Sequence, residues 1–162
     1  MLGLTVGASA YTGETAQNAS FGGSEMRQRI TVWDRRADYP DRAGDIRGLV
    51  AGASVDDVPE LNQMIGLTGG EGIGTSMLGW YVQAGYDVLR STTLEDQLLP
   101  YIRYEKVDTQ REVAAGFAAD PANDVTITSL GAAWKPVPQV VLKADYQLWS
   151  NAAETATDQW NV

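Results

Sequence analysis

The most constraining feature of this sequence is a strict two-residue alternation of apolar and polar positions over the 11 residues from Leu78 to Val88. One set of alternate positions holds Leu78, Trp80, Val82, Ala84, Tyr86 and Val88, and the other holds Gly79, Tyr81, Gln83, Gly85 and Asp87. Successive side chains of a β-strand point to opposite faces, so the pattern predicts a strand with one apolar and one polar face. Its length is what a tilted strand needs to cross the hydrocarbon of a bilayer.

The alternation recurs along the chain, clearly in 2–11 and 140–148 and with more noise in 98–105 and 128–134. We predict strands at 2–11, 27–39, 44–54, 75–89, 97–107, 125–135 and 139–149. The predicted fold is therefore all-β: an antiparallel transmembrane β-barrel, present as a partial barrel of about seven strands plus a truncated last strand that begins at Gln159. Within 29–39 the residues Trp33, Asp34, Arg35 and Arg36 do not separate by face. We therefore assign no lipid contact there and interpret the segment as a subunit interface or a short rim strand.

Connections of unequal length alternate between these predicted strands. Short turns are expected near 40–43, 90–96 and 136–138, and longer loops at 11–26, 55–74, 108–124 and 151–158. Short turns at one end and long loops at the other are typical of outer-membrane barrels. The second long loop is predicted to hold a short helix at the mouth of the barrel, with Asp57 as its N-cap, Pro59 in its first turn and Gly66 at its end.

Composition excludes several functional classes. The chain has no cysteine and no histidine, so disulfides, thiolate nucleophiles, imidazole metal sites and Ser-His-Asp catalysis are absent from it. A net charge of −9 disfavours binding to nucleic acid phosphates. We expect no enzymatic activity, no cofactor and no metal site, and we interpret the acidic loops as solvated.

Four segments resemble the C-terminal half of the phosphate-selective porins of Gram-negative outer membranes: 78–87, 99–105, 130–138 and 140–147. The resemblance covers nearly the whole chain and implies a barrel of about 16 strands, often assembled as a homotrimer. It implies a bacterial outer-membrane location and a channel through which small hydrophilic solutes or anions diffuse, with lipid as the other partner. Residues 1–162 are then one barrel segment, expected to be a fragment because Gln159–Val162 begins a strand that stops short.

Charged and polar residues on the second faces of the strands are the candidate pore-lining residues: Arg36, Arg47, Gln83, Asp87, Tyr101, Arg103, Glu105, Lys143, Asp145 and Gln147. The alternative to a pore-lining role is that Arg103 with Glu105, and Lys143 with Asp145, are ordinary charge pairs on a sheet. Aromatic residues expected near the two membrane interfaces are Trp80, Tyr86, Tyr104, Trp134, Tyr146 and Trp149.

Two other interpretations of the whole chain stay open. One is a small closed barrel of eight strands with a filled interior and a structural or adhesive role, which counts the segment at Trp160 as the eighth strand. The other is a soluble β-sandwich binding module, in which the alternation would mark one buried face of each strand.

Overall fold

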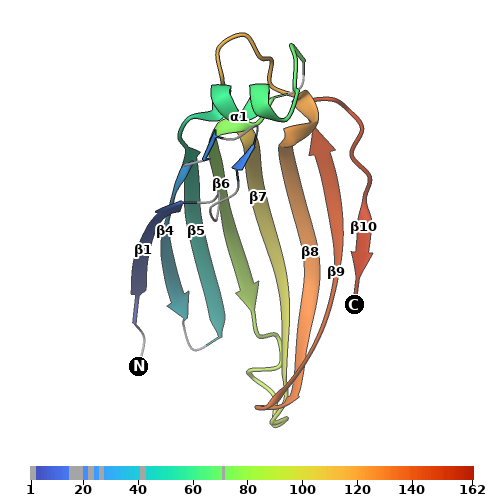
Figure 1. Ribbon diagram of the computed structural model, residues 1–162. Helices are drawn as coiled ribbons and strands as arrows, with labels where there is room; N and C mark the ends of the chain where they lie inside the picture. The colour runs from blue at the N-terminus through green and yellow to red at the C-terminus, as the bar shows by residue number, and fades with distance from the viewer. Residues whose placement is uncertain (1–2, 15–19, 22–23, 26–27, 41–42, 71) are drawn as a thin grey trace.

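The computed structural model describes residues 3–14, 20–21, 24–25, 28–40, 43–70 and 72–162, and its main feature is one antiparallel sheet of eight strands (Figure 1). The strands lie side by side in chain order: β1 (Thr5–Glu14), β4 (Arg29–Pro40), β5 (Gly44–Val55), β6 (Gly74–Tyr86), β7 (Gln97–Val113), β8 (Asp124–Val137), β9 (Val140–Asn151) and β10 (Gln159–Asn161). Two short strands, β2 (Ser20–Phe21) and β3 (Ser24–Glu25), pair separately. The predicted all-β class is confirmed.

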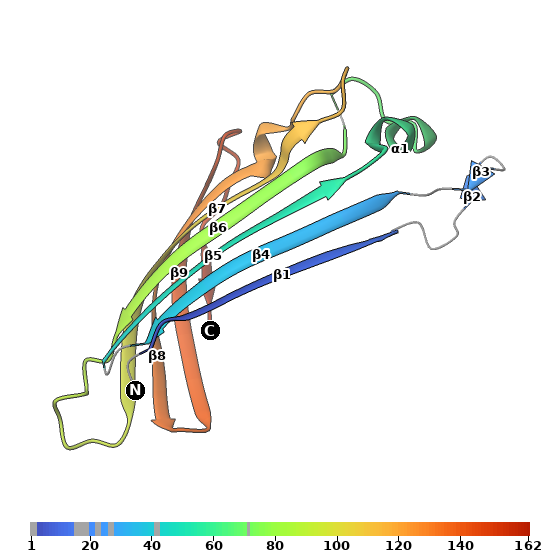
Figure 2. The same ribbon diagram turned by 90° about the vertical axis from the view of Figure 1, so that its left-hand side faces the viewer.

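The sheet is strongly curved, and β1 and β10 form its two edges (Figures 1 and 2). Each strand of this sheet pairs with the sheet strand that comes before it along the chain, which is the order of an up-and-down meander. In the described part of the chain no second large sheet packs against this one. The two-layer packing of a β-sandwich is therefore not the arrangement seen.

The predicted strands agree with those observed in number and approximate position. The clearest difference is β7, which runs 17 residues to Val113 rather than stopping near 107. Its pairing with β6 shifts register on either side of Ser76, so an irregularity accommodates the extra length. The first strand is also displaced, running from Thr5 to Glu14 rather than over 2–11. The pairing of β2 with β3 was not predicted.

The connections divide the sheet into two unlike ends. At the end that we call the turn end, residues 41–43, 87–96 and 138–139 link the strands. At the opposite end, the loop end, the links are 15–28, 56–73, 114–123 and 152–158. The predicted contrast in length holds only in part, because the turn-end link 87–96 is longer than the loop-end link 152–158. Helix α1 (Val58–Met64) lies at the loop end, beyond the end of β5, and the short 3₁₀ helix η1 (Pro121–Asn123) precedes β8.

The predicted helix is present, but Asp57 does not cap it through its side chain. Asp57 has φ 55° and ψ 30°, a left-handed conformation, whereas a capping side chain normally belongs to an extended residue. Gly66 follows the helix with φ 75°, as expected of a glycine that ends a helix. No helix in the described ranges is long and apolar enough to span a membrane.

Two of the loops at the loop end are tied to each other. Asn62 of α1 is fully buried, and its Oδ1 accepts a hydrogen bond from the backbone N–H of Ile73 at 3.1 Å. Gln110 donates to the carbonyl of Gly72 at 2.6 Å and accepts from the N–H of Asp120 at 2.6 Å. The loop that carries α1 is thereby joined through β7 to the loop that carries η1.

Candidate functional site

The pairing register brings polar side chains from all eight strands into one row across one face of the sheet. We call such a row of directly opposed residues a level, and the next level on the same face lies two residues further along each strand. Directly opposed residues of neighbouring antiparallel strands share a face, so a chain of opposed pairs marks a line across the sheet. One such line, which we call the polar belt, runs Thr5, Asp38, Arg47, Gln83, Arg103, Ser129, Gln147 and Gln159. Every side chain in it can form hydrogen bonds.

The residues next to the polar belt along each strand form a second line on the opposite face. This line, the apolar belt, runs Tyr39, Ile46, Ala84, Ile102, Leu130, Tyr146 and Trp160 across seven strands. Its members are solvent-exposed to a degree unusual for apolar side chains: Ile46 is 52% exposed, Ile102 51% and Trp160 77%. The two belts lie back to back and are offset by one residue.

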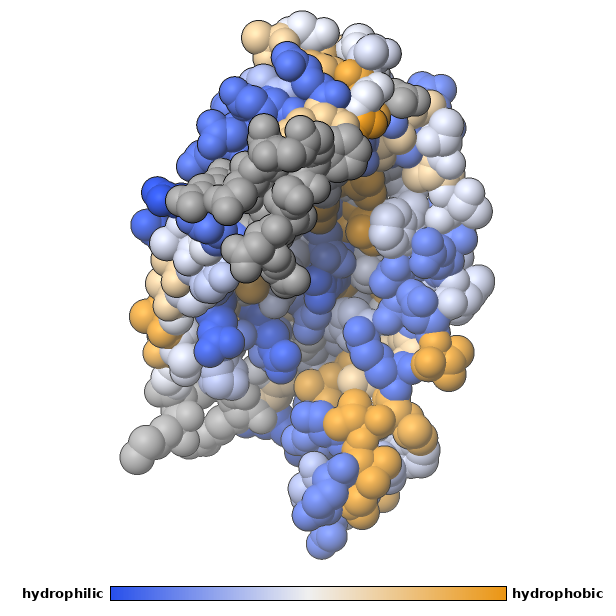
Figure 3. Space-filling view, viewed as in Figure 1, coloured by the Kyte–Doolittle hydropathy of each residue, from blue (hydrophilic) through white to orange (hydrophobic). Residues whose placement is uncertain are grey.

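The polar belt lies on the concave face of the curved sheet. Hydrophilic side chains are seen in the middle of the hollow, apolar side chains appear in its upper part, and further apolar side chains lie on the outer parts of the molecule (Figure 3). Burial agrees with this placement, because Ser129 and Asp145 on the polar face are 3% and 6% exposed while the apolar belt is open. At these levels of the sheet, polar side chains are therefore more buried than apolar ones, which is unusual for a sheet in water.

Nine of the ten candidate pore-lining residues lie on this concave face within four adjacent levels. Arg47, Gln83, Arg103 and Gln147 belong to the polar belt; Arg36 and Glu105 lie one level toward the loop end; Tyr101 and Asp145 lie one level, and Lys143 two levels, toward the turn end. Asp87 is different, because it follows β6 in a turn. Its Oδ1 accepts the backbone N–H groups of Leu89 and Leu98 at 3.1 and 3.2 Å, which fixes the turn.

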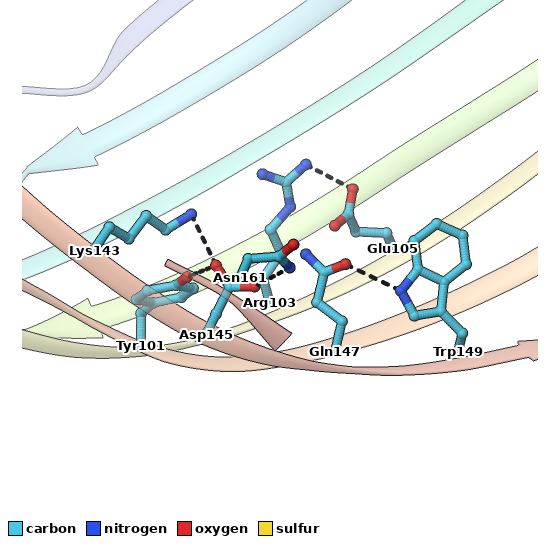
Figure 4. A network of polar contacts seen from close by, with 8 residues as sticks. All are labelled: Tyr101, Arg103, Glu105, Lys143, Asp145, Gln147, Trp149 and Asn161. Atoms are coloured by element: carbon cyan, nitrogen blue, oxygen red, sulfur yellow. Dashed lines mark hydrogen bonds and ion pairs between the residues drawn. The ribbon is translucent and has the colours of Figure 1, made fainter. Parts of the chain in front are cut away.

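A buried carboxylate organises the cluster on β7, β9 and β10 (Figure 4). Asp145 accepts hydrogen bonds from the hydroxyl of Tyr101 at 2.9 Å and from Nδ2 of Asn161 at 2.9 Å, and Nζ of Lys143 lies 3.4 Å from it. The ring of Tyr101 lies over Gly131, where a Cβ atom would come within 2.5 Å of it. The glycine therefore gives the tyrosine room to reach across β8 to Asp145.

Two arginines of the polar belt each pair with a carboxylate two residues away on the same strand. Arg103 donates to Glu105 at 2.6 Å, and its guanidinium lies 3.8 Å from the centre of the Tyr81 ring. Arg47 contacts Asp45 through both Nε, at 3.0 Å, and Nη2, at 2.5 Å. The side chain of Arg103 is 29% exposed and that of Arg47 is 51% exposed, so the β7 pair is the more enclosed.

Of the six aromatic residues expected near the membrane interfaces, five lie on the convex face and Trp149 does not. The ring centres of Trp80 and Tyr104 lie 5.6 Å apart. Trp134 donates a hydrogen bond from Nε1 to Asp96 at 2.9 Å, near the turn end. Trp149 faces the concave side and donates from Nε1 to Gln147 at 3.0 Å. The prediction for Trp149 was wrong because it weighed distance from the strand end over the two-residue period, which puts odd-numbered residues of β9 on the polar face.

The convex face becomes mixed in polarity two levels toward the loop end from the apolar belt. There the opposed residues are Arg35, Val50, Trp80, Lys106, Thr126 and Ser150. This change explains why β4 did not separate by face in the sequence. Its convex positions Ala37 and Tyr39 are apolar, whereas Arg35 lies where the face has already become mixed in polarity.

No known protein family matches this chain, and no solved structure matches it. An uncharacterized protein of Aquifex aeolicus (strain VF5) is 39% identical over 70 residues. The match covers 43% of this chain and 16% of that relative. The chain thus corresponds to a small part of the relative, and the arrangement of side chains on the sheet is the basis for a functional proposal.

Several members of the concave face were missed by sequence analysis. Ser129 lies in the polar belt opposite Arg103, and Asn161 holds the second oxygen of Asp145. Tyr81 was assigned to the polar face, but its contact with Arg103 was not foreseen. A two-residue period gives the face of each residue, whereas these contacts depend on the register between strands.

Proposed function

We propose that the chain forms part of the wall of an outer-membrane β-barrel porin, a water-filled channel through which small hydrophilic solutes diffuse passively. The observation that carries this proposal is the pair of back-to-back belts, polar on the concave face and apolar on the convex face. A wall with this polarity suits lipid outside and water inside, which is the reverse of a soluble domain. The resemblance to phosphate-selective porins and the unequal ends of the sheet support the same proposal.

The energetics of the two faces favour this environment over bulk water. Contiguous apolar surface of the extent seen on the convex face is rare on soluble monomers and calls for a lipid or protein partner. The charged cluster around Asp145 and Arg103 could not face hydrocarbon without a large cost, because each charge there would lose its hydration. Lipid outside and water inside satisfies both faces of the same strands.

A bilayer also requires that the backbone groups on the edges of the sheet be paired. The outer edges of β1 and β10 therefore meet further strands in our proposal, from the same polypeptide or from another copy of it. Helix α1 and the loops tied through Gln110 would lie at the mouth of the channel. We propose diffusion and assign no chemical reaction to the concave face.

A small closed barrel with a filled interior is the second candidate. The observation that favours it is the sheet itself, which has eight strands in meander order and a partly packed concave face. It would need β1 and β10, the two edges of the sheet, to meet. The two candidates differ in whether water and ions reach the polar belt.

Substituted-cysteine accessibility tests the proposal sharply, because the chain has no cysteine of its own. The complete protein that carries these strands would be placed in planar bilayers as Gln83→Cys or Ala84→Cys, which are sequence neighbours on opposite faces. A charged, membrane-impermeant methanethiosulfonate reagent is expected to reduce the current through Gln83→Cys and to leave Ala84→Cys unchanged. Gln147→Cys and Leu148→Cys repeat the comparison on β9.

The outcomes separate the candidates. Stable current steps with reaction only at positions 83 and 147 support the porin. An inserted, folded protein without current and with all four thiols unreactive supports the filled barrel. Equal reaction on both faces means that water reaches the convex side, which contradicts a membrane-spanning wall of either kind.

A further inference from the structure

The fixed charges on the concave face balance at the levels where the strands pair in regular register, which leaves out Arg111 and Glu112 beyond the register shift between β6 and β7. Its cations are Arg36, Arg47, Arg103, Lys135 and Lys143, and its carboxylates are Asp34, Asp38, Asp45, Glu105 and Asp145. The excess negative charge of the chain therefore lies elsewhere, mainly in its loops and turns. A lining that attracts anions would instead carry a surplus of cations.

The balance is also local, because three of the cations have a carboxylate partner two residues away on their own strand. These pairs are Arg47 with Asp45, Arg103 with Glu105, and Lys143 with Asp145, at 2.5, 2.6 and 3.4 Å. Arg36 has no ion pair among the described residues, but Asp34 and Asp38 flank it on the same strand and face. Opposite charges this close largely cancel at the distance of a passing solute.

The uncharged side chains between these pairs are amides and hydroxyls. Gln83 separates Arg47 from Arg103 in the polar belt, and Ser129, Gln147 and Gln159 continue it. Amides and hydroxyls both donate and accept hydrogen bonds, which suits solutes that carry hydroxyl groups. The charged groups add little bias toward either ion, so hydrogen bonding remains as the main interaction that this wall offers.

We propose that this wall serves uncharged, hydroxyl-bearing solutes such as sugars and polyols, and that the Arg103–Glu105 pair keeps it free of an anion preference. The inference rests on the proposed channel function and departs from the anion passage that the resemblance implies. Its geometric basis is the set of same-strand ion pairs together with the amide and hydroxyl side chains of the polar belt.

The test measures the reversal potential of the complete protein in a planar bilayer under a potassium chloride gradient. Glu105→Gln is expected to shift it toward anion preference and Arg103→Gln toward cation preference by a similar amount. The double variant is expected to return to the wild-type value, because removing a balanced pair removes no net charge. Lys106→Gln is the matched control, since Lys106 lies on the convex face, paired with Asp124 at 2.6 Å.

Inorganic phosphate and an uncharged oligosaccharide are then compared as blockers of the wild-type current. A current reduced by the oligosaccharide and unaffected by phosphate at the same concentration agrees with the proposal. Block by phosphate that Arg103→Gln abolishes overturns it, as does a double variant whose reversal potential moves toward cations. If Glu105→Gln fails to fold, Asp45→Asn and Arg47→Gln provide the same cycle on β5. A protein without current contradicts the channel function itself and is recognised separately by the absence of current steps.

Discussion

The two faces of the sheet differ more from each other than any two strands do. At one level, Arg47, Gln83 and Arg103 face the concave side, and one residue away Ile46, Ala84 and Ile102 face outward. The polar face buries Ser129 to 3% exposure, whereas the apolar face leaves Trp160 77% exposed. In water a sheet lowers its free energy by the opposite arrangement. The channel wall that we propose accounts for the difference by placing lipid on one side of the layer and water on the other.

The largest effect on stability is expected from a charge on the convex face. Ile46→Arg puts a charge on the convex face and is expected to lower the free energy of unfolding in phospholipid vesicles by about 2–4 kcal/mol if its level lies near the bilayer midplane. Thr5→Arg, in the polar belt on the concave face opposite Asp38, is the control and is expected to change it by less than about 1 kcal/mol. Urea titration of both variants measures the difference, and equal losses would contradict lipid on one side only.

A smaller effect is expected from filling the space under Tyr101. A Cβ atom on Gly131 would lie 2.5 Å from the Tyr101 ring and 2.7 Å from the carbonyl oxygen of Ala144. Gly131→Ala is therefore expected to cost about 1–3 kcal/mol, since both the ring and a backbone atom must move. Gly79→Ala is the control, because its nearest neighbour would lie at 3.5 Å, an ordinary contact. Similar stabilities for the two variants in denaturant titration would show that Tyr101 has other room.

A smaller loss of stability is expected from removing the Tyr101 hydroxyl on the concave face. Tyr101→Phe deletes the hydrogen bond to Asp145 and leaves a buried carboxylate with one donor fewer, at an expected cost of about 1–2 kcal/mol. Tyr86→Phe removes a hydroxyl from an outward side chain that is 57% exposed and is expected to have little effect. Thermal or denaturant unfolding distinguishes them, and a neutral Tyr101→Phe would mean that Asn161 and Lys143 suffice for Asp145.

The smallest stability effect is expected at the exposed ion pair on β5. Asp45→Asn is expected to change the free energy of unfolding by less than about 1 kcal/mol, because the Arg47 side chain is 51% exposed and exposed ion pairs contribute little. Its effect on ion selectivity is expected to exceed its effect on stability. A loss of several kcal/mol would show that the pair is enclosed by parts of the protein outside this sheet.

The sequence alone predicted the strands and the face of most residues, because both follow from the local two-residue period. Asp57 shows one limit of such prediction, since its left-handed backbone prevents the capping expected of its residue type. The length of β7 shows another, because the polar residues of 108–113 read as a loop and pair as a strand.

The polar belt could not be predicted from the sequence. Its alignment depends on how far each strand is shifted against the next, which the connections and cross-strand packing decide together. The contact of Asn161 with Asp145 illustrates this, since it joins residues separated by a connection whose geometry the sequence does not specify. Candidates named individually, such as Arg47, Gln83, Arg103 and Gln147, therefore emerged as one line only in the structure.

The one-residue offset between the belts also determines which insertions and deletions the protein can accept. Adding one residue inside a paired strand such as β8 would move Ser129 and Leu130 to each other's faces and exchange the environments of all residues beyond the insertion. Adding two residues would keep every face and change only the level. Homologous sequences are accordingly expected to vary in length within the loop-end connections and, where they vary inside the strands, to do so by even numbers of residues.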